Sequence, residues 1–217
     1  MKEREFLNSI SSLPVITTKQ VTALLGEKAY SKVFLNRLMQ RGSIRRVERG
    51  IYTIHDDPMI YATHMFYPSY ISLLSAFQYH GTTTQLPINI TVMTTRNHHI
   101  DNIEFIRIKE IWGYQKVVYL DFQIFMAELE KAIIDAILTE MTPLDEIQSA
   151  LEECDLNKLT DFTMRMNTSS RKKIGYVADI SGFFLERVHD SIKNDRNYVY
   201  YSTGERGNRW RVSNDRS

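Results

Sequence analysis

The 217-residue sequence lacks several features that define large classes of protein. Its single cysteine, Cys154, excludes a disulfide within the chain and is compatible with a reducing compartment. No apolar run approaches the roughly 18 residues of a membrane-spanning helix. Residues 1–13 are charged at Lys2, Glu3, Arg4 and Glu5 and have no apolar core of the kind found in signal peptides. We therefore expect a cytoplasmic protein.

The chain also has little net charge, but its charge is unevenly distributed. The formal charge is +1, and residues 1–56 alone carry ten basic and five acidic side chains. Residues 57–100 are neutral, whereas residues 101–161 carry five basic and fourteen acidic side chains. Residues 162–217 carry eleven basic and six acidic ones. This partition predicts a basic amino-terminal domain, an acidic segment that cannot lie along DNA, and a basic carboxy-terminal segment that could.

Residues 28–54 are the most informative stretch, because they predict a short helix, a stop and a basic β-ribbon. A helix over residues 31–41 would bury one face, which carries Phe34, Leu35, Leu38 and Met39. Ser31 is suited to cap its first turn, and Gly42 suits the left-handed residue that follows a helix. Two strands, residues 43–46 and 49–54, would then form a wing around a turn near Gly50.

The charges of this stretch favour contact with DNA. Seven of the eight charged residues between 28 and 49 are basic, as phosphate neutralisation requires. Asn36 and Gln40 can pair with adenine, Arg37 can pair with guanine, and Val33 can meet a thymine methyl group. A solvated, charged helix and hairpin is the alternative. The candidate DNA contacts are Thr18, Lys19, Lys28, Ser31, Lys32, Val33, Asn36, Arg37, Gln40, Arg41, Arg45, Arg46 and Arg49.

Two helices are predicted before this stretch. Residues 2–13 have apolar side chains at helical spacing up to Pro14, and residues 19–25 repeat the pattern between a capping Thr18 and Gly26. Helix, helix, turn, helix and wing is the order of a winged helix-turn-helix module. The second helix of such a module starts at the DNA backbone, so Thr18 and Lys19 are candidate phosphate contacts.

The sequence as a whole predicts an α+β fold with a domain boundary at residues 55–58. Residues 1–56 would form a winged-helix DNA-binding domain, and residues 57–217 a mixed α/β effector domain. In the second domain we expect a helix from Tyr70 to a stop at Gly81 and an antiparallel pair of strands over residues 88–95 and 103–109. Further on we expect a strand within residues 112–122, helices over 124–139, 142–151, 156–166 and 174–184, and a final strand at Trp210.

Three groups of side chains in the second domain invite other interpretations. Glu128 and Asp135, on one helix face with Lys131, could be a carboxylate pair for acid–base chemistry or Mg²⁺, but ion pairing that supports the helix is favoured. His98, His99 and Asp101 are predicted to lie in an exposed hairpin tip rather than a metal site. The aromatic residues between 61 and 79 predict core more strongly than a ligand pocket. We accordingly expect no catalytic residue, metal or cofactor.

Four motifs, in order, resemble the AbiEi family of antitoxins from abortive-infection toxin–antitoxin systems. They are RRVERGIY at residues 45–52, YISLLSAFQYHG at 70–81 with a proline-led strand at 87–95, AELEKAIIDAI at 127–137, and RKKIGYVADISG at 171–182. The resemblance covers nearly the whole chain.

This resemblance implies a winged-helix domain that represses its own operon and an α/β domain needed for antitoxin action. It also implies double-stranded DNA as a partner, namely the protein's own promoter with inverted repeats. The functional partner that the resemblance implies is a nucleotidyltransferase-like toxin, which would be countered without a stable complex. DNA contact carries over to the matching positions Lys32, Asn36, Arg37, Gln40, Arg45, Arg46 and Arg49. The alternative is a stand-alone winged-helix regulator whose second domain senses a ligand or partner.

Overall fold

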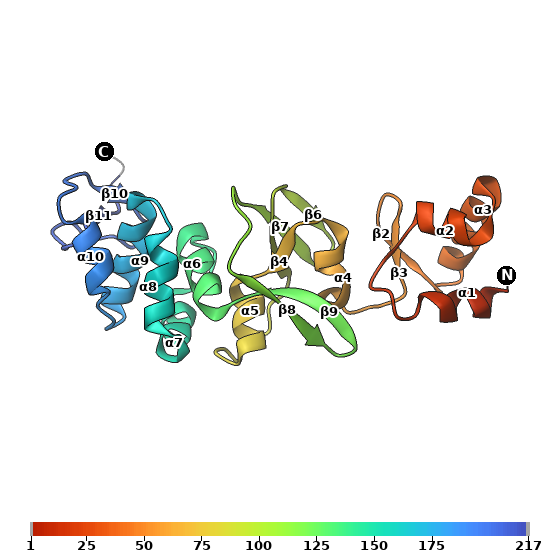
Figure 1. Cartoon of the computed structure of the whole chain (residues 1–217), viewed down its shortest axis with the longest axis horizontal. Coiled ribbons are helices and arrows are strands. Elements are labelled where there is room, and N and C mark those ends of the chain that lie inside the picture. Colours follow the sequence, from red (N-terminus) through yellow and green to blue (C-terminus); the bar gives the residue numbers. More distant parts are fainter. Residues whose placement is uncertain (1, 216–217) are drawn as a thin grey trace. The chain divides into compact units, whose positions relative to one another are not determined.

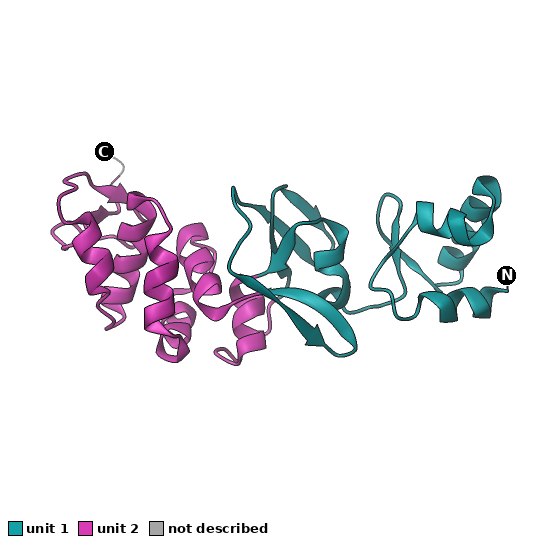
Figure 2. Ribbon diagram, viewed as in Figure 1, with its two compact units in different colours: residues 1–71, 88–126 teal, residues 72–87, 127–217 magenta. Residues whose placement is uncertain are grey.

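The computed structural model describes residues 2–215 and is a mixed α+β protein, which confirms the predicted class (Figure 1). Within these residues the chain forms ten α-helices and three β-sheets. It divides into two compact units, one of Met1–Ile71 with Ile88–Met126 and the other of Ser72–Pro87 with Ala127–Ser217 (Figure 2). The predicted boundary near residue 56 lies inside the first unit and stays a prediction.

The first part of unit 1 contains three helices and a small antiparallel sheet. The helices are α1 (Glu3–Ile10), α2 (Thr18–Leu25) and α3 (Lys28–Gln40). The strands are β1 (Ile16–Thr17), β2 (Arg45–Glu48) and β3 (Ile51–Thr53), in the order β1-β3-β2. The sequence predicted the ribbon of β2 and β3 but not β1, which has only two residues and pairs with β3.

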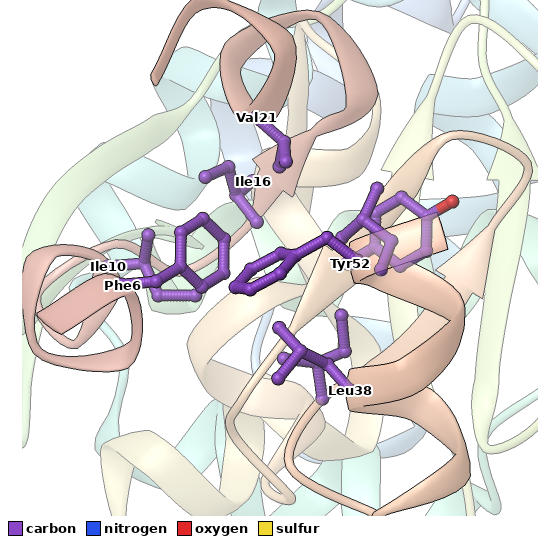
Figure 3. Close-up of a cluster of buried hydrophobic side chains, with 9 residues drawn as sticks. Phe6, Ile10, Ile16, Val21, Leu38 and Tyr52 are labelled. Carbon is purple, nitrogen blue, oxygen red and sulfur yellow. The ribbon is translucent and has the colours of Figure 1, made fainter. Parts of the chain in front are cut away.

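One hydrophobic core holds these elements together (Figure 3). Phe6 of α1 meets Phe34 of α3 edge to face, with ring centroids 5.1 Å apart. Such an aromatic pair adds stability beyond the area that it buries. The buried members of the core are Phe6, Ile10, Ile16, Val21, Phe34, Leu35, Leu38, Ile44 and Tyr52. They come from all three helices and the sheet, so the core fixes α3 relative to the ribbon.

Two predicted helix caps are wrong. Helix α2 is capped by Thr17, whose hydroxyl accepts from the Gln20 N–H, while Gln20 in turn accepts from the Thr17 N–H. This capping box requires Gln three residues after the cap, which Thr17 has and Thr18 lacks. Helix α3 begins at Lys28, so Ser31 lies inside the helix, where its hydroxyl donates to the carbonyl of Glu27 at 2.6 Å.

The rest of unit 1 contains α4 (Pro58–Met65) and a six-stranded mixed sheet. Asp57 caps α4 through the Met59 N–H, so the turn signals at residues 57–58 start a helix that the sequence did not predict. The strand order is β6-β7-β5-β4-β9-β8. The strands are β4 (Ser69–Ile71), β5 (Ile90–Thr94), β6 (His98–Ile100), β7 (Ile103–Arg107), β8 (Tyr114–Tyr119) and β9 (Phe122–Ala127).

The predicted antiparallel pairing of residues 88–95 with 103–109 is wrong. Strands β5 and β7 are parallel neighbours, and the antiparallel partner of β7 is β6, which includes His98. A polar segment that was predicted to be a turn is therefore an edge strand with a tight turn after it. Two predicted helices also start late, because residues 69–71 and 122–127 form β4 and β9. Both strands lie inside the sheet, and a short apolar run does not distinguish a buried strand from a helix.

Unit 2 is mainly helical. Its helices are α5 (Leu73–His80), α6 (Leu129–Thr139), α7 (Leu144–Glu153), α8 (Leu156–Met164), α9 (Thr168–Ile180) and α10 (Glu186–Ile192). Helix α6 contacts α5, α7, α8 and α9 and is buried along most of its length. Two short parallel strands, β10 (Val199–Tyr200) and β11 (Val212–Ser213), pack on α9. As predicted, Gly81 ends α5 in the left-handed conformation.

Candidate nucleic-acid interface

The outward face of α3 carries the predicted base-reading side chains. Phe34, Leu35 and Leu38 point into the core, since each is at most 1% exposed. The opposite face is exposed and holds Lys32, Val33, Asn36, Arg37 and Gln40. Val33 is 68% exposed, which is unusual for a valine and leaves its methyl groups available to an apolar partner. The helix therefore presents one cation-rich, amide-bearing surface to solvent.

Arg37 is oriented by the core side of its own helix. Its guanidinium carbon lies 5.2 Å from the centroid of the Phe34 ring. Attraction between a guanidinium and an aromatic face restricts the side chain without occupying its hydrogen-bond donors. A pre-positioned fork of N–H donors is the arrangement that bidentate pairing with guanine requires.

The start of α2 is joined to the turn between β2 and β3. The backbone N–H of Thr18 donates to the carbonyl of Gly50 at 2.9 Å, and the Thr18 hydroxyl approaches the same oxygen at 3.4 Å. Gly50 has φ +81°, so a side chain there would be strained. Thr18 is half-buried by this contact, whereas the neighbouring Lys19 is exposed. Lys28, at the first turn of α3, is also exposed.

The two consecutive arginines of β2 have different surroundings. The Arg45 guanidinium donates to the hydroxyl of Tyr61 at 2.9 Å and to the carbonyls of His55 and Asp56 at 3.2 and 3.3 Å. It also lies over the Tyr61 ring, 5.7 Å from the centroid. Successive strand residues point to opposite faces, so Arg46 is directed away from this cluster. Arg45, Arg46 and Arg49 are all exposed, so these surroundings rather than exposure distinguish Arg45.

Three of the predicted DNA contacts are thus committed to contacts within the chain. Ser31 is fully buried and unavailable to a large ligand. Its burial contradicts the prediction that it contacts DNA. Arg41 forms an ion pair with Glu3 at 2.5 Å, which ties the end of α3 to α1. Arg45 holds residues 55–61 as described above. The structure brings the remaining candidates together on the α3 face, the start of α2 and the ribbon.

A hydrogen bond links the ribbon to the central sheet. A carboxylate oxygen of Glu48 lies 2.6 Å from Nε2 of His98 on β6, and the other accepts from the Arg49 N–H at 2.6 Å. The hydrogen bond from the Arg49 N–H is the main reason that the pKa of Glu48 lies below its usual value, and the hydrogen bond with His98 is the second. The sequence predicted His98 as part of an exposed tip and gave no signal for this partner, which is 50 residues away.

The carboxylates considered for acid–base chemistry lie in a packed helical setting. Lys131 and Asp135 are buried and form an ion pair, and the Ser72 hydroxyl donates to the second oxygen of Asp135 at 2.9 Å. Burial lowers the pKa of Lys131, an effect that the Asp135 carboxylate opposes. Glu128 instead pairs with Lys158 at 2.6 Å. The predicted ion pair within the helix is therefore confirmed for Lys131 and Asp135. It is wrong for Glu128, which precedes α6 and pairs with a lysine of α8.

Residues 2–215 contain no helix that is long and apolar enough to cross a membrane. In the same residues, no three side chains of histidine, cysteine, aspartate or glutamate are grouped where they could hold a metal ion.

These features define a mixed α+β protein whose amino-terminal three-helix, three-stranded part exposes a basic helix face. Residues 4–55 match the model of a family described as transcriptional regulator, AbiEi antitoxin. The predicted resemblance to AbiEi antitoxins is thereby confirmed for these residues.

A solved structure shares the fold over most of the chain. The RV2827C protein from Mycobacterium tuberculosis is similar with a TM-score of 0.64, over 95% of this chain and 89% of that chain. The two sequences are 13% identical, so the likeness is one of fold alone. No curated protein matches the sequence.

Proposed function

We propose that residues 1–56 are a winged-helix DNA-binding domain and that the protein is an autorepressor and antitoxin of an AbiEi type. Helix α3 is the recognition helix, and the ribbon of β2 and β3 is the wing. The observation that carries the proposal is the exposed α3 face, which combines cations with the side-chain amides of Asn36 and Gln40. Phosphate binding alone needs only the cations, whereas amides add recognition of bases.

The wing and the start of α2 supply contacts to the DNA backbone in this proposal. Arg46 and Arg49 are exposed on the ribbon, and Lys19 is exposed beside the Thr18–Gly50 junction. A helix in the major groove with flanking cations on the phosphates is the usual docking geometry of helix-turn-helix modules. The family match at residues 4–55 supports the same assignment for this part of the chain.

Residues 57–217 form the effector domain in this proposal, with a nucleotidyltransferase-like toxin as functional partner. Antitoxin action would not need a stable complex with that toxin. Because the family match ends at residue 55, a stand-alone regulator with a ligand- or partner-sensing second domain is the competing proposal. Co-expression separates the two: the full chain should restore growth to cells that express the toxin encoded beside it, and failure to do so would favour the regulator.

DNA binding is tested by titrating the full chain against a labelled duplex from upstream of its own gene at several salt concentrations. Each neutralised phosphate contributes about −0.9 to the slope of log K against log salt, so several contacts give a steep decline. A flat salt response would remove the DNA-binding proposal. Arg196→Ala, which changes an exposed arginine of unit 2, is the matched control and should leave affinity and slope unchanged.

A further inference from the structure

An open hollow lies between the wing and the edge of the central sheet in unit 1. Its volume is about 530 Å³, and it is lined by Arg46, Glu48 and Arg49 of the ribbon and by His98, His99 and Asp101 of β6 and the following turn. These two segments are about fifty residues apart in the sequence. The hollow is mostly polar, and charged or titratable side chains contribute to both of its walls.

The formal charge of the hollow depends on its two histidines. Arg46 and Arg49 balance Glu48 and Asp101 when both imidazoles are neutral. Each imidazole that takes up a proton adds one positive charge, so the hollow ranges from neutral to +2. Histidine is the side chain that proteins most often use to change charge with pH.

His98 is held in place from several sides. Its ring packs edge to face on Phe66 at 5.5 Å and lies 6.3 Å from the ring of Phe105, between centroids. Its Nε2 contacts Glu48, and the neighbouring His99 is paired across the strands with Glu104. The titratable and charged groups around His98 are therefore Glu48, Arg46, Arg49, His99, Asp101 and Glu104.

We propose that this hollow binds a phosphate group of a DNA backbone and extends the DNA-contact surface from the wing onto β6. The proposal rests on the DNA-binding function proposed above. Arg46 and Arg49 supply N–H donors to the phosphate oxygens, and protonated His98 lies between the phosphate and Glu48, where it offsets their mutual repulsion. The central sheet thereby takes part in binding, beyond the segment that matches the AbiEi family model.

This site makes DNA affinity depend on pH in one direction. A phosphate stabilises the charged imidazole, so binding takes up protons and is strongest at acidic pH. The added affinity is lost as pH rises and the imidazole of the complex gives up its proton. If phosphate raises the proton affinity of one imidazole tenfold, the binding constant falls by up to about tenfold as the pH rises through the titration of that imidazole.

The experiment measures binding of the full chain to a labelled duplex across this pH range at constant ionic strength. The duplex can have any sequence, because a phosphate contact carries no base preference. His98→Gln should bind more weakly at about pH 6 and lose most of the pH dependence, since His99 is then the remaining imidazole of the hollow. His98→Arg keeps a permanent charge that can still pair with Glu48, so it should bind tightly at both ends of the range.

His64→Gln is the matched control. His64 lies in the same unit, and its Nε2 contacts the carbonyl of Gln123 at 2.7 Å, outside the hollow. This variant should keep the pH profile of the unchanged protein. Thermal unfolding of all three variants establishes that they are folded, and the His98→Arg result stands on its own if His98→Gln is unstable.

The outcomes separate this inference from the function on which it rests. Salt-dependent DNA binding with the same pH profile in His98→Gln would overturn the phosphate site and leave the DNA-binding function intact. Absence of binding to any duplex would overturn both. If inorganic phosphate shifts the NMR resonance of the His98 ring while the duplex does not, the hollow holds a free phosphate ion, and its assignment to DNA is wrong.

Discussion

Helices α3 and α9 make different use of basic residues. Both helices have 13 residues and both carry several basic side chains. On α3 the cations Lys32 and Arg37 point to solvent. On α9 the Lys172 ammonium is fully buried and binds the Asp195 carboxylate at 3.1 Å and the Asn197 carbonyl at 2.5 Å. The first helix leaves its charge exposed to solvent, whereas the second uses its charge to hold a loop of its own unit.

The neighbours of Lys172 show the same pattern. Arg171 donates to the carbonyl of Met164, and Lys173 pairs with Glu140 at 3.5 Å. Other basic side chains of the carboxy-terminal segment have acidic partners as well. These pairs are Arg187–Asp161, Lys193–Asp190, Arg206–Asp215 and Arg209–Asp179. The net charge of +5 predicted a surface that could lie along DNA, but these pairs place carboxylates beside many of the basic side chains. Glu140 and Asp161, which lie outside residues 162–217, offset two of the five charges. The number of basic side chains in a segment therefore does not identify a DNA-binding surface unless the acidic partners of those side chains are also known.

The largest effect is expected where α9 is packed most tightly. A Cβ at Gly175 would lie 2.0 Å from a ring carbon of the fully buried Trp210. Gly175→Ala should therefore lower the free energy of unfolding by about 3 kcal/mol through overpacking, outweighing the gain of up to about 1 kcal/mol from helix propensity. Urea denaturation measures the change. On the exposed face of α3, Val33→Ala should change the free energy of unfolding by less than about 0.5 kcal/mol. Equal losses of stability in Gly175→Ala and Val33→Ala would contradict the difference between the two helices.

The second prediction compares one lysine from each helix. Lys172→Met leaves the carbonyl of Asn197 and the Asp195 carboxylate without their donor, so the urea midpoint should fall clearly. Lys32→Met removes an exposed charge and should leave that midpoint almost unchanged while it weakens DNA binding. Denaturation and DNA titration of both variants test this. A stability loss in Lys32→Met as large as in Lys172→Met would show that the Lys32 side chain makes contacts that stabilise the fold.

A third prediction concerns base recognition by α3. Arg37→Ala and Gln40→Ala should each reduce discrimination between the preferred duplex and a mismatched one by about 1–3 kcal/mol, because a bidentate contact is lost. Competition binding with both duplexes gives the measurement. Since Arg196 belongs to unit 2, Arg196→Ala serves as the control. Equal weakening of binding to both duplexes would indicate that Arg37 and Gln40 contact the DNA phosphate backbone instead of the bases.

The smallest predicted effect separates the arginines of the wing. Arg49→Ala should make the slope of log K against log salt shallower by about 0.9, the value of one phosphate contact. Arg45→Ala should leave the slope unchanged, because its guanidinium is bound to Tyr61 and to two backbone carbonyls. A titration series in salt compares them. Equal slope changes would mean that Arg45 leaves its cluster when DNA binds.

The parts of the fold that follow from local patterns were predicted from the sequence. The buried and exposed faces of α3 match the helical spacing of Phe34, Leu35 and Leu38. Gly26 and Gly81 end their helices with positive φ, as their lack of a Cβ allows. Helix α3 extends one turn before its predicted start, because Glu27 rather than Ser31 occupies the cap position.

The parts that depend on distant neighbours were not predicted. Strand β4 exists because β5 and β9 lie on either side of it, and no local signal distinguishes Tyr70 in that strand from the first turn of α5. Arg45 differs from Arg46 through its hydrogen bonds to Tyr61, on the next helix, and to the carbonyls of His55 and Asp56. The same holds for His98, whose partner Glu48 belongs to the wing. Strand pairing and side-chain partners are long-range properties that the spacing of residues does not record.

The bond between the Thr18 amide and the Gly50 carbonyl has a mechanical consequence. It joins the helix before α3 to the tip of the ribbon, and the shared core fixes α3 to both. If α3 and the ribbon contact DNA as proposed, they do so at a fixed separation that the protein cannot adjust. A duplex of unsuitable groove width must itself deform, at an energetic cost that varies with its sequence. Affinity for an operator would then depend on how easily its DNA deforms, including at base pairs that no side chain contacts.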